Sequence, residues 1–275
     1  MGRKRVLVTG ASRGIGRAAA LGLRDAGHEV LAGVRGDDAA AAAERDGLRP
    51  VRLDVTDAAS VEAAAREAGD RLDVLVNNAG VAIAAPLETV PLDELRRQLE
   101  VNVVGQVAVL QALLPALRAA RGRVVFVSSA SGRVSLPVMT PYSASKHAIE
   151  AIADGLRGEL RPWGIDVVLV EPGSVDTDIW RGADAELEAT IGAMREEHRR
   201  LYAPLLESSR RFARENARRA APVDGVTAAI VRAATAERPR TRYPVGQDAK
   251  AMLALRRLLP DRAFDALVRR ATGAP

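Results

Sequence analysis

Short apolar runs alternate along this chain with longer segments in which apolar residues recur at helical spacing. Several runs are apolar at successive positions, which is typical of strands that are covered on both faces of a sheet. The predicted strands are residues 5–9, 28–34, 48–54, 73–77, 122–128 and 165–171. The predicted helices are residues 14–26, 37–46, 57–69, 91–120 and 141–161. This alternation predicts right-handed crossovers, so we expect an α/β fold with a doubly wound parallel β-sheet flanked by helices.

The alternation stops at residue 178, and a helical stretch of mixed charge follows as far as residue 221. After it come a helix near residues 223–236, a strand at 241–245 and a terminal helix ending near Arg270. The last two belong to a C-terminal extension of about residues 238–275. No linker of low complexity divides the chain, so we predict one domain over residues 1–275.

Prolines mark two of the predicted helices. Pro115 lies inside the helix at 91–120 and should kink it or end its regular hydrogen bonding. Thr140 and Pro141 suit the N-cap and the first position of the helix that follows them. Tyr142 and Lys146 therefore fall in the first two turns of that helix.

Composition narrows the kinds of protein that this chain can be. The 40 basic and 35 acidic residues are interspersed, even in the arginine-rich residues 195–219, so we expect a solvated helical face there and no nucleic-acid partner. There is no cysteine, and the three histidines lack metal-ligand spacing, so we expect neither disulfides nor a metal site. We find no signal peptide and no run approaching the length of a membrane span, which favours a cytoplasmic protein.

The first strand runs directly into the sequence TGASRGIG, in which Gly10, Gly14 and Gly16 open a helix. Glycines there allow a tight turn, a close approach of the backbone to a pyrophosphate and close packing of the helix. The free N–H groups at the start of the helix face the anion. Such a turn after the first strand of a βαβ array predicts a dinucleotide site.

The end of the second strand selects the dinucleotide. An acidic residue there would accept hydrogen bonds from a free ribose 2′-hydroxyl but would repel a 2′-phosphate. This chain has Val34 at that place, followed by Arg35, and Arg13 lies inside the glycine loop. Two guanidinium groups favour NADP(H) over NAD(H). Asp37 and Asp38 could bend back to the ribose instead, but we predict that they cap the next helix.

A tyrosine and a lysine four residues apart share one helix face. The ammonium of Lys146 can therefore approach the phenol of Tyr142 and favour its ionised form. The sequence VSSASG ends the fifth strand and NNAG ends the fourth, so both lie at the carboxyl edge of the sheet, where ligands bind. Asn77 in NNAG could be only a strand-end cap, and we leave it out of the site.

In these motifs the chain resembles the short-chain dehydrogenase/reductase family, in its compact single-domain branch. TGASRGIG, LDVTD, NNAG, VNVVG, SSASG, YSASK and EPGSVDT occur in the family's order and intervals over about residues 4–180. The resemblance implies a Rossmann-type fold and hydride transfer between the nicotinamide of NADP(H) and a carbonyl or alcohol carbon. VEPGSVDTDIW and PRTRYPVGQDA also resemble the hydroxysteroid and retinoid branch.

The resemblance implies catalytic roles for four residues. Tyr142 would be the general acid in reduction and the general base in oxidation, while Lys146 would lower its pKa and bind the nicotinamide ribose. Ser129 would hydrogen-bond the substrate oxygen, and Asn102 would hold a water that links Lys146 to solvent. Ser128 is the alternative to Ser129, because it is the neighbouring hydroxyl and points to the opposite face if the strand continues.

The resemblance also implies a cofactor-binding set. Asp54 and Val55 would lie near the adenine, residues 78–80 along the ribose and nicotinamide side, and residues after the sixth strand around the carboxamide. The whole set is Gly10, Ser12, Arg13, Gly14, Ile15, Gly16, Arg35, Asp54, Val55, Asn78, Ala79, Gly80, Tyr142, Lys146, Pro172, Gly173, Val175 and Thr177.

The stretch from about residue 178 to 221 corresponds to the part of the family that forms a helical flap over the substrate. Its apolar spacing predicts an apolar face on the side of the flap that covers the substrate, so we expect a bulky apolar small molecule as substrate. The same residues could equally pack the core. They are Leu187, Ile191, Met194, Leu201, Tyr202, Leu205, Leu206 and Phe212.

Apolar residues beyond one face on the helices at 98–117 and 144–160 predict a homodimer or homotetramer, as the family's four-helix seam implies. Two other functions compete with an enzyme working in solution. One is an NADP-binding regulator without turnover, against which the intact set of Asn102, Ser129, Tyr142 and Lys146 speaks. The other is a peripheral membrane enzyme with residues 195–219 on anionic lipid, but we expect no membrane contact.

Overall fold

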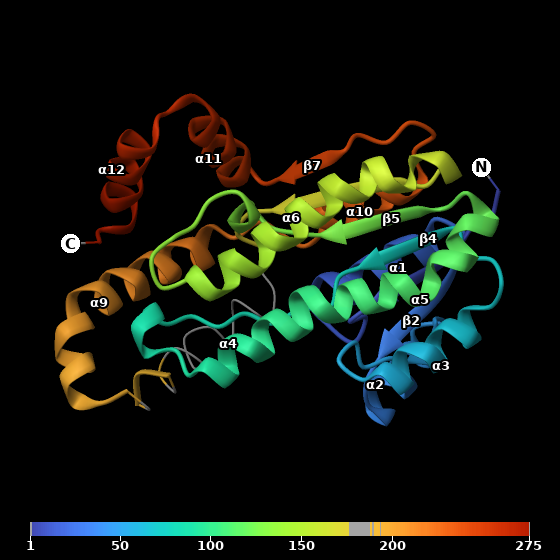
Figure 1. The fold of residues 1–275 in the computed structure, drawn as a ribbon, viewed down its shortest axis with the longest axis horizontal. Coiled ribbons are helices and arrows are strands. Elements are labelled where there is room, and N and C mark those ends of the chain that lie inside the picture. The colour runs from blue at the N-terminus through green and yellow to red at the C-terminus, as the bar shows by residue number, and fades with distance from the viewer. Residues whose placement is uncertain (1, 176–187, 189, 193, 275) are drawn as a thin grey trace.

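The computed structural model describes residues 2–175, 188, 190–192 and 194–274. Within this part of the chain, seven parallel strands form one sheet in the order β3-β2-β1-β4-β5-β6-β7 (Figure 1). The strand order reverses between β1 and β4, which is where open α/β sheets bind ligands. The predicted doubly wound parallel sheet is confirmed. Its strands are β1 Arg5–Thr9, β2 Glu29–Val34, β3 Arg49–Arg52, β4 Val74–Asn77, β5 Arg123–Val127, β6 Asp166–Pro172 and β7 Arg242–Val245.

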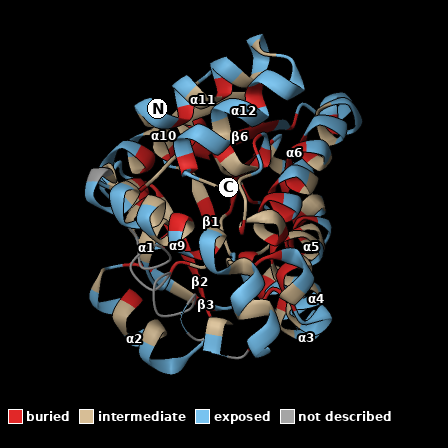
Figure 2. Ribbon diagram, turned by 90° about the vertical axis from the view of Figure 1, so that its left-hand side faces the viewer, coloured by how far each residue is buried: buried red, intermediate tan, exposed pale blue. Residues whose placement is uncertain are grey.

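Helices cover both faces of the sheet, which explains the continuous apolar runs. Leu7 packs into the cluster under one layer of helices, whereas Val6 and Val8 pack into the cluster under the other. Figure 2 shows buried residues concentrated in the strands and on the helix sides that face them. The first layer contains α3 Ala58–Ala68, α5 Gly105–Ala120 and α6 Thr140–Leu160, and the second contains α1 Gly14–Asp25, α2 Asp37–Arg45 and α10 Asp224–Thr235.

The predicted helix at 91–120 has an irregularity in a different place from the one expected. The π-helical segment η2 Glu100–Val104 separates α4 Leu92–Leu99 from α5, and α5 continues through Pro115 as far as Ala120. Pro115 therefore does not end the helix. Asn102 lies in the π-helical turn, a feature that is frequent at functional sites.

Our expectation that no run approaches the length of a membrane span was wrong by length and composition. The joined helices from Leu92 to Ala120 have 29 residues and a mean hydropathy of 1.5 in their most apolar window. This stretch is apolar because one side of α5 belongs to the core. Val109, Leu110, Leu113 and Leu117 are almost fully buried against the sheet.

The C-terminal part contributes helices that gather at one end of the molecule, toward which β5 and β7 point (Figure 1). The single terminal helix that we predicted is two helices. Leu259 and Pro260 are extended between them, since a proline within a helix would lack the N–H that the helix needs. These helices are α9 Glu196–Arg219, α11 Gln247–Leu258 and α12 Asp261–Thr272, and the short 3-10 turns are η1 Leu87–Thr89, η3 Ala130–Gly132 and η4 Arg161–Trp163.

Candidate active site

The glycine loop between β1 and α1 is shaped by close backbone contacts. Gly10 has φ +65°, and a Cβ on it would lie 3.0 Å from the Cα of Ala79. A Cβ on Gly16 would overlap the carbonyl oxygen of Gly10 and the side-chain amide of Asn78. The loop therefore tolerates no side chain at these positions, and its backbone stays open to a bound phosphate.

Gly16→Ala should lower the free energy of unfolding by about 1–3 kcal/mol, because the new methyl group must displace backbone at Gly10. Urea unfolding measures this loss. The matched control is Gly158→Ala on the exposed side of α6, where a Cβ meets nothing within 4 Å. There we expect a gain of about 0.5–1 kcal/mol from helix propensity. Equal stability of the two variants would contradict the packing described for Gly16.

The loop after β4 is held from several sides. The Thr9 hydroxyl accepts hydrogen bonds from the N–H groups of Asn78 and Ala79, both at 2.9 Å. The Gln106 side chain donates to the Ala79 carbonyl at 2.7 Å, and Asn77 donates to the Gln106 carbonyl at 2.9 Å. Asn77 is thus buried and has a structural contact. Sequence reasoning missed Thr9 and Gln106. Their only signal in the sequence is that each is a polar residue in an otherwise apolar segment.

A cavity of about 200 Å³ opens at the carboxyl edge of the sheet, at the reversal of strand order. It brings together most of the predicted cofactor residues. They are Gly10, Ser12, Arg13, Gly14, Ile15, Gly16, Arg35, Asp54, Val55, Asn78, Ala79, Gly80, Tyr142 and Lys146. The cavity walls outside our predicted set come from the same strand ends and loops and are Gly33, Val34, Leu53, Thr56, Val81, Val101, Val127 and Ser128.

Two arginines lie at the end of the cavity near β2. Arg13 and Arg35 are exposed, and neither forms an ion pair with a carboxylate in the described part of the chain. The Asp54 carboxylate accepts hydrogen bonds from the backbone N–H and hydroxyl of Thr56, at 3.0 and 2.7 Å. The Thr56 N–H, above all, lowers the pKa of Asp54, and the charge of Arg35 adds to this. Two arginines and an aspartate whose pKa is lowered thus line this end.

The aspartates after Arg35 do not cap α2 as we predicted. Gly36 is the N-cap, and no side chain caps the helix there. Asp37 lies one residue further on, in the first turn, and pairs with Arg52 of β3, because that guanidinium extends from the neighbouring strand. Both aspartates still lie in the first turn of α2, where their negative charges interact favourably with the positive end of the helix dipole.

Tyr142 and Lys146 both line the cavity from the first turns of α6. The Lys146 ammonium is buried, donates to the Val127 carbonyl at 2.8 Å and lies 5.8 Å from the centroid of the Tyr142 ring. Burial lowers the pKa of Lys146 to about 8, and Glu150 opposes this shift. Burial also raises the pKa of Tyr142, opposed only by a hydrogen bond with Ser129.

The expected stabilisation of the phenolate by Lys146 therefore does not appear in this geometry. Desolvation opposes ionisation of the phenol, and the ammonium points to a carbonyl instead of the phenol oxygen. At neutral pH Tyr142 is a neutral hydrogen-bond donor beside a protonated lysine.

The two serines at the end of β5 have different surroundings. Ser129 contacts Tyr142, accepts the Ser131 N–H at 3.1 Å and reaches the Pro172 carbonyl at 3.4 Å. Ser128 lines the cavity, but its hydroxyl is buried next to Gly132 and has no hydrogen-bond partner among the described residues. The structure thus brings Ser129, and not Ser128, to Tyr142.

Asn102 ties the loop after β4 to α6. Its side chain donates to the Val81 carbonyl and the Ser145 hydroxyl, both at 2.9 Å, and accepts the Val81 N–H at 2.8 Å. It does not line the cavity, and among the described residues no hydrogen bond joins its side chain to Lys146. The link from Asn102 to Lys146 through a water stays a prediction.

The residues predicted around the carboxamide lie apart from the cavity walls. Pro172 ends β6 next to Ser129, Gly173 follows it, and Val175 is buried in the second core layer. Thr177 lies outside the described residues, as do residues 178–187, 189 and 193 of the predicted flap at about 178–221, which we call the lid. In the described part of the chain, no group of three or more His, Asp or Glu side chains could hold a metal ion.

The cavity fits a dinucleotide phosphate by its own construction. A glycine cradle too tight for a Cβ, the start of α1 and two arginines without carboxylate partners among the described residues line one end. Tyr142 and Lys146 line the other end, and Ser129 contacts Tyr142 without lining the cavity itself. A comparison with protein families finds the short chain dehydrogenase model over residues 4–188. The chain belongs to the short-chain dehydrogenase/reductase family. The predicted family is therefore confirmed.

Relatives of this chain match over almost their whole length. The NADPH-dependent 3-dehydrocapnine reductase of Ornithobacterium rhinotracheale is 36% identical over 94% of both chains. Retinol dehydrogenase 5 of Mus musculus is 34% identical over 96% of this chain and 87% of its own length. A short-chain dehydrogenase from Burkholderia cenocepacia, solved in complex with NADP, superposes with a TM-score of 0.75 at 28% identity, covering 98% and 97% of the two chains.

Proposed function

We propose that this enzyme transfers a hydride between NADP(H) and a carbonyl or secondary alcohol of a bulky apolar substrate. The observation that carries the proposal is the meeting of Tyr142, Ser129 and buried Lys146 beside the cavity that the glycine loop opens. Tight binding of NADPH in a fluorescence titration, followed by turnover of apolar ketones or alcohols, tests it. Tight binding without turnover over a broad panel would favour the regulator instead.

The proposed mechanism uses hydroxyl donors beside the reacting carbon. The nicotinamide, when bound, supplies or accepts the hydride. During reduction the carbonyl oxygen gains negative charge, and Ser129 and Tyr142 would donate hydrogen bonds to it in a partly dry site. Tyr142 would then give its proton to that oxygen, which completes the alcohol. Lys146, protonated below about pH 8, lies 5.8 Å from the centre of the Tyr142 ring and would have to leave the Val127 carbonyl to bind the phenolate directly.

Arg13 and Arg35 support the choice of NADP(H). In the described part of the chain neither is paired with a carboxylate, so both are free to bind a 2′-phosphate with charge-assisted hydrogen bonds. The relatives named for NADPH and solved with NADP support the same choice.

Replacing Arg35 with alanine should weaken NADPH binding about 10- to 100-fold and leave NADH binding nearly unchanged, because only NADPH carries the 2′-phosphate. Titration calorimetry with both nucleotides measures this. Arg45→Ala is the matched control, since Arg45 lies at the other end of α2 and outside the cavity. Equal losses for NADPH and NADH would remove the cofactor assignment.

An apolar cluster supports the choice of substrate. Ala85, Val90, Val138, Met194 and Leu206 are buried together, so the described part of the lid packs on the loop after β4 and on the loop before α6. Val138 lies four residues before Tyr142, which brings this cluster close to the reacting group. An enzyme named as a retinol dehydrogenase among the relatives agrees with a large apolar substrate.

We also propose that the enzyme works as a homodimer or homotetramer in the cytoplasm. Val104, on the predicted seam, is 52% exposed, and Leu92, which lies before the seam at the start of α4, is 64% exposed. Exposed apolar side chains on neighbouring helices are suited to a symmetric interface. The absence of cysteine agrees with a reducing compartment.

A further inference from the structure

The loop after β6 is held by one segment of the C-terminal extension. This segment, residues 242–248, contains β7 and the start of α11, and we call it the brace segment. The N–H of Gly173 donates to the Val245 carbonyl at 2.9 Å, and the N–H of Ser174 donates to the Asp248 carboxylate at 2.7 Å. Two successive backbone groups thus bind to residues more than seventy positions away along the chain.

Two glycines allow Asp248 to come this close. A Cβ on Gly173 would overlap both carboxylate oxygens of Asp248, and a Cβ on Gly246 would overlap one of them. Gly246 also has φ +100°, a backbone angle that residues other than glycine rarely adopt. The position of the Asp248 carboxylate therefore explains why both Gly173 and Gly246 lack a side chain.

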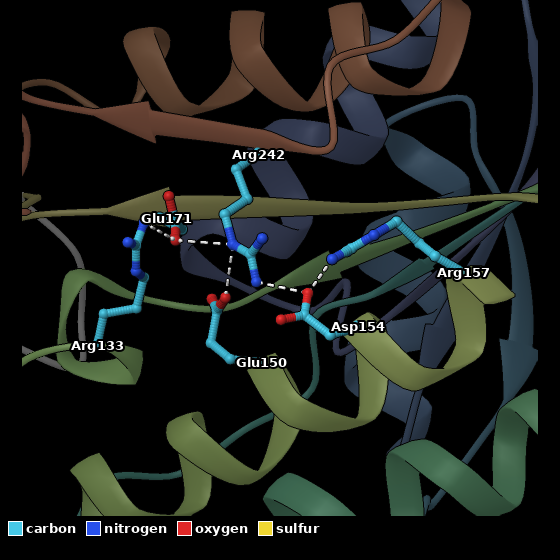
Figure 3. A network of polar contacts seen from close by, with 6 residues as sticks. All are labelled: Arg133, Glu150, Asp154, Arg157, Glu171 and Arg242. Carbon is cyan, nitrogen blue, oxygen red and sulfur yellow. Dashed lines mark hydrogen bonds and ion pairs between the residues drawn. The ribbon is translucent and has the colours of Figure 1, made fainter.

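The other end of the brace segment holds the residue before Pro172. Arg242 contacts Glu171 of β6 at 3.5 Å and Glu150 of α6 at 3.0 Å (Figure 3). Arg133, just after η3, contacts Glu171 from the opposite side at 3.6 Å. Glu150 lies one turn after Lys146, so the brace segment connects β6 with the helix that carries the candidate catalytic pair.

The braced loop adjoins the candidate catalytic groups. Ser129, which contacts Tyr142, reaches the carbonyl of Pro172 at 3.4 Å. A shift of the backbone after Pro172 would therefore change the geometry at the end of the site where the nicotinamide is expected. It would not change the position of the arginines at the adenosine end.

We propose that Asp248 is a positioning residue, which holds the backbone of Gly173 and Ser174 and through it the nicotinamide end of the bound cofactor. The inference rests on the proposed function for the identity of that cofactor. A different explanation is that Asp248 only stabilises the first turn of α11, as acidic residues at helix starts do. The two explanations differ in which part of a nucleotide loses affinity.

The experiment compares three variants by calorimetry with two probes. NADPH carries the nicotinamide, whereas adenosine 2′,5′-bisphosphate has only the end that the arginines bind. We expect Asp248→Ala to weaken NADPH about tenfold and to leave the bisphosphate unchanged. Asp248→Asn keeps an acceptor oxygen and should stay close to the wild type. Asp261→Ala, in the first turn of α12, is the matched control and should change neither affinity.

Hydrogen exchange tests the anchor without any nucleotide. The Ser174 amide should exchange about tenfold faster in Asp248→Ala, since it loses its acceptor. Unchanged exchange there, or equal weakening of both probes, would overturn the proposal. So would an asparagine variant as weak as the alanine variant. If the wild-type enzyme binds neither probe, the proposed function fails, while the exchange result still decides whether Asp248 holds the loop.

Discussion

Replacing Tyr142 with phenylalanine should lower kcat by about 100- to 10,000-fold while NADPH binds with its normal affinity. The substitution removes one hydroxyl and keeps the ring that lines the cavity. The lost group is the candidate proton donor beside Ser129, and the Lys146 ammonium, directed at the Val127 carbonyl, cannot take its place. Steady-state kinetics with excess NADPH and a nucleotide titration separate the two effects.

Ser143→Ala is the matched control for this loss. Ser143 is the next residue along α6, and its buried hydroxyl has no partner in the described part of the chain. Its removal should therefore change kcat little. Full activity of Tyr142→Phe would refute the mechanism. A parallel loss of NADPH affinity would instead indicate that the hydroxyl binds the cofactor and does not serve the proton transfer alone.

The glycine loop and the strand ends could be predicted because their signals are local. Gly10, Gly14 and Gly16 occur within seven residues and follow directly after a strand, so spacing alone identifies the turn. Sequence spacing also favoured Ser129 over Ser128, and Ser129 is the serine that contacts Tyr142, while its catalytic role stays a prediction. In the same way, successive apolar residues were enough to predict a sheet covered on both faces.

The contacts that fix the site could not be predicted, because they join distant parts of the chain. Thr9 meets Asn78, and Asp248 meets Ser174, across about seventy residues in each case. The direction of the Tyr142 pKa shift was equally hidden. An i,i+4 spacing allows the Lys146 ammonium to reach the phenol. In the fold, however, the ammonium donates its hydrogen bond to the Val127 carbonyl, which lies far away in the sequence.

Helix interruptions show the same division. Pro260 separates α11 from α12, but Pro115 leaves α5 intact, although both are the same residue. The residues around Pro115 pack on the sheet as part of α5. Pro204 likewise lies inside α9, so a proline in the sequence does not by itself fix where a helix ends.

Arg242→Ala should lower the free energy of unfolding at pH 8 by about 3 kcal/mol, because it leaves two buried carboxylates without their shared cation. The side chains of Glu171 and Glu150 are 1% and 8% exposed, and Arg242 bridges both (Figure 3). Arg133 still contacts Glu171 from one side. Glu150 loses its ion-pair partner, and the longer-range charge of Lys146 still acts on its buried carboxylate.

The loss should depend on pH in a direction that follows from Glu171. Burial, and then the charge of Glu150, raise its pKa from 4.5 to about 7, against the influence of Arg133 and Arg242. The stability that this raised pKa confers is complete below pH 4.5 and is lost as the pH rises to 7, since the unfolded chain ionises first. Removing Arg242 raises the pKa further, so the variant should lose more at pH 8 than at pH 5.

Urea unfolding of the wild type and of Arg242→Ala at both pH values measures this difference. Arg157→Ala is the matched control, because Arg157 pairs with Asp154 in the same network but contacts neither buried glutamate. Adding Glu171→Gln to Arg242→Ala should recover part of the loss at pH 8 by removing one of the uncompensated charges. An equal loss at pH 5 and pH 8 would show that Arg242 acts through packing of its side chain, and not through its charge.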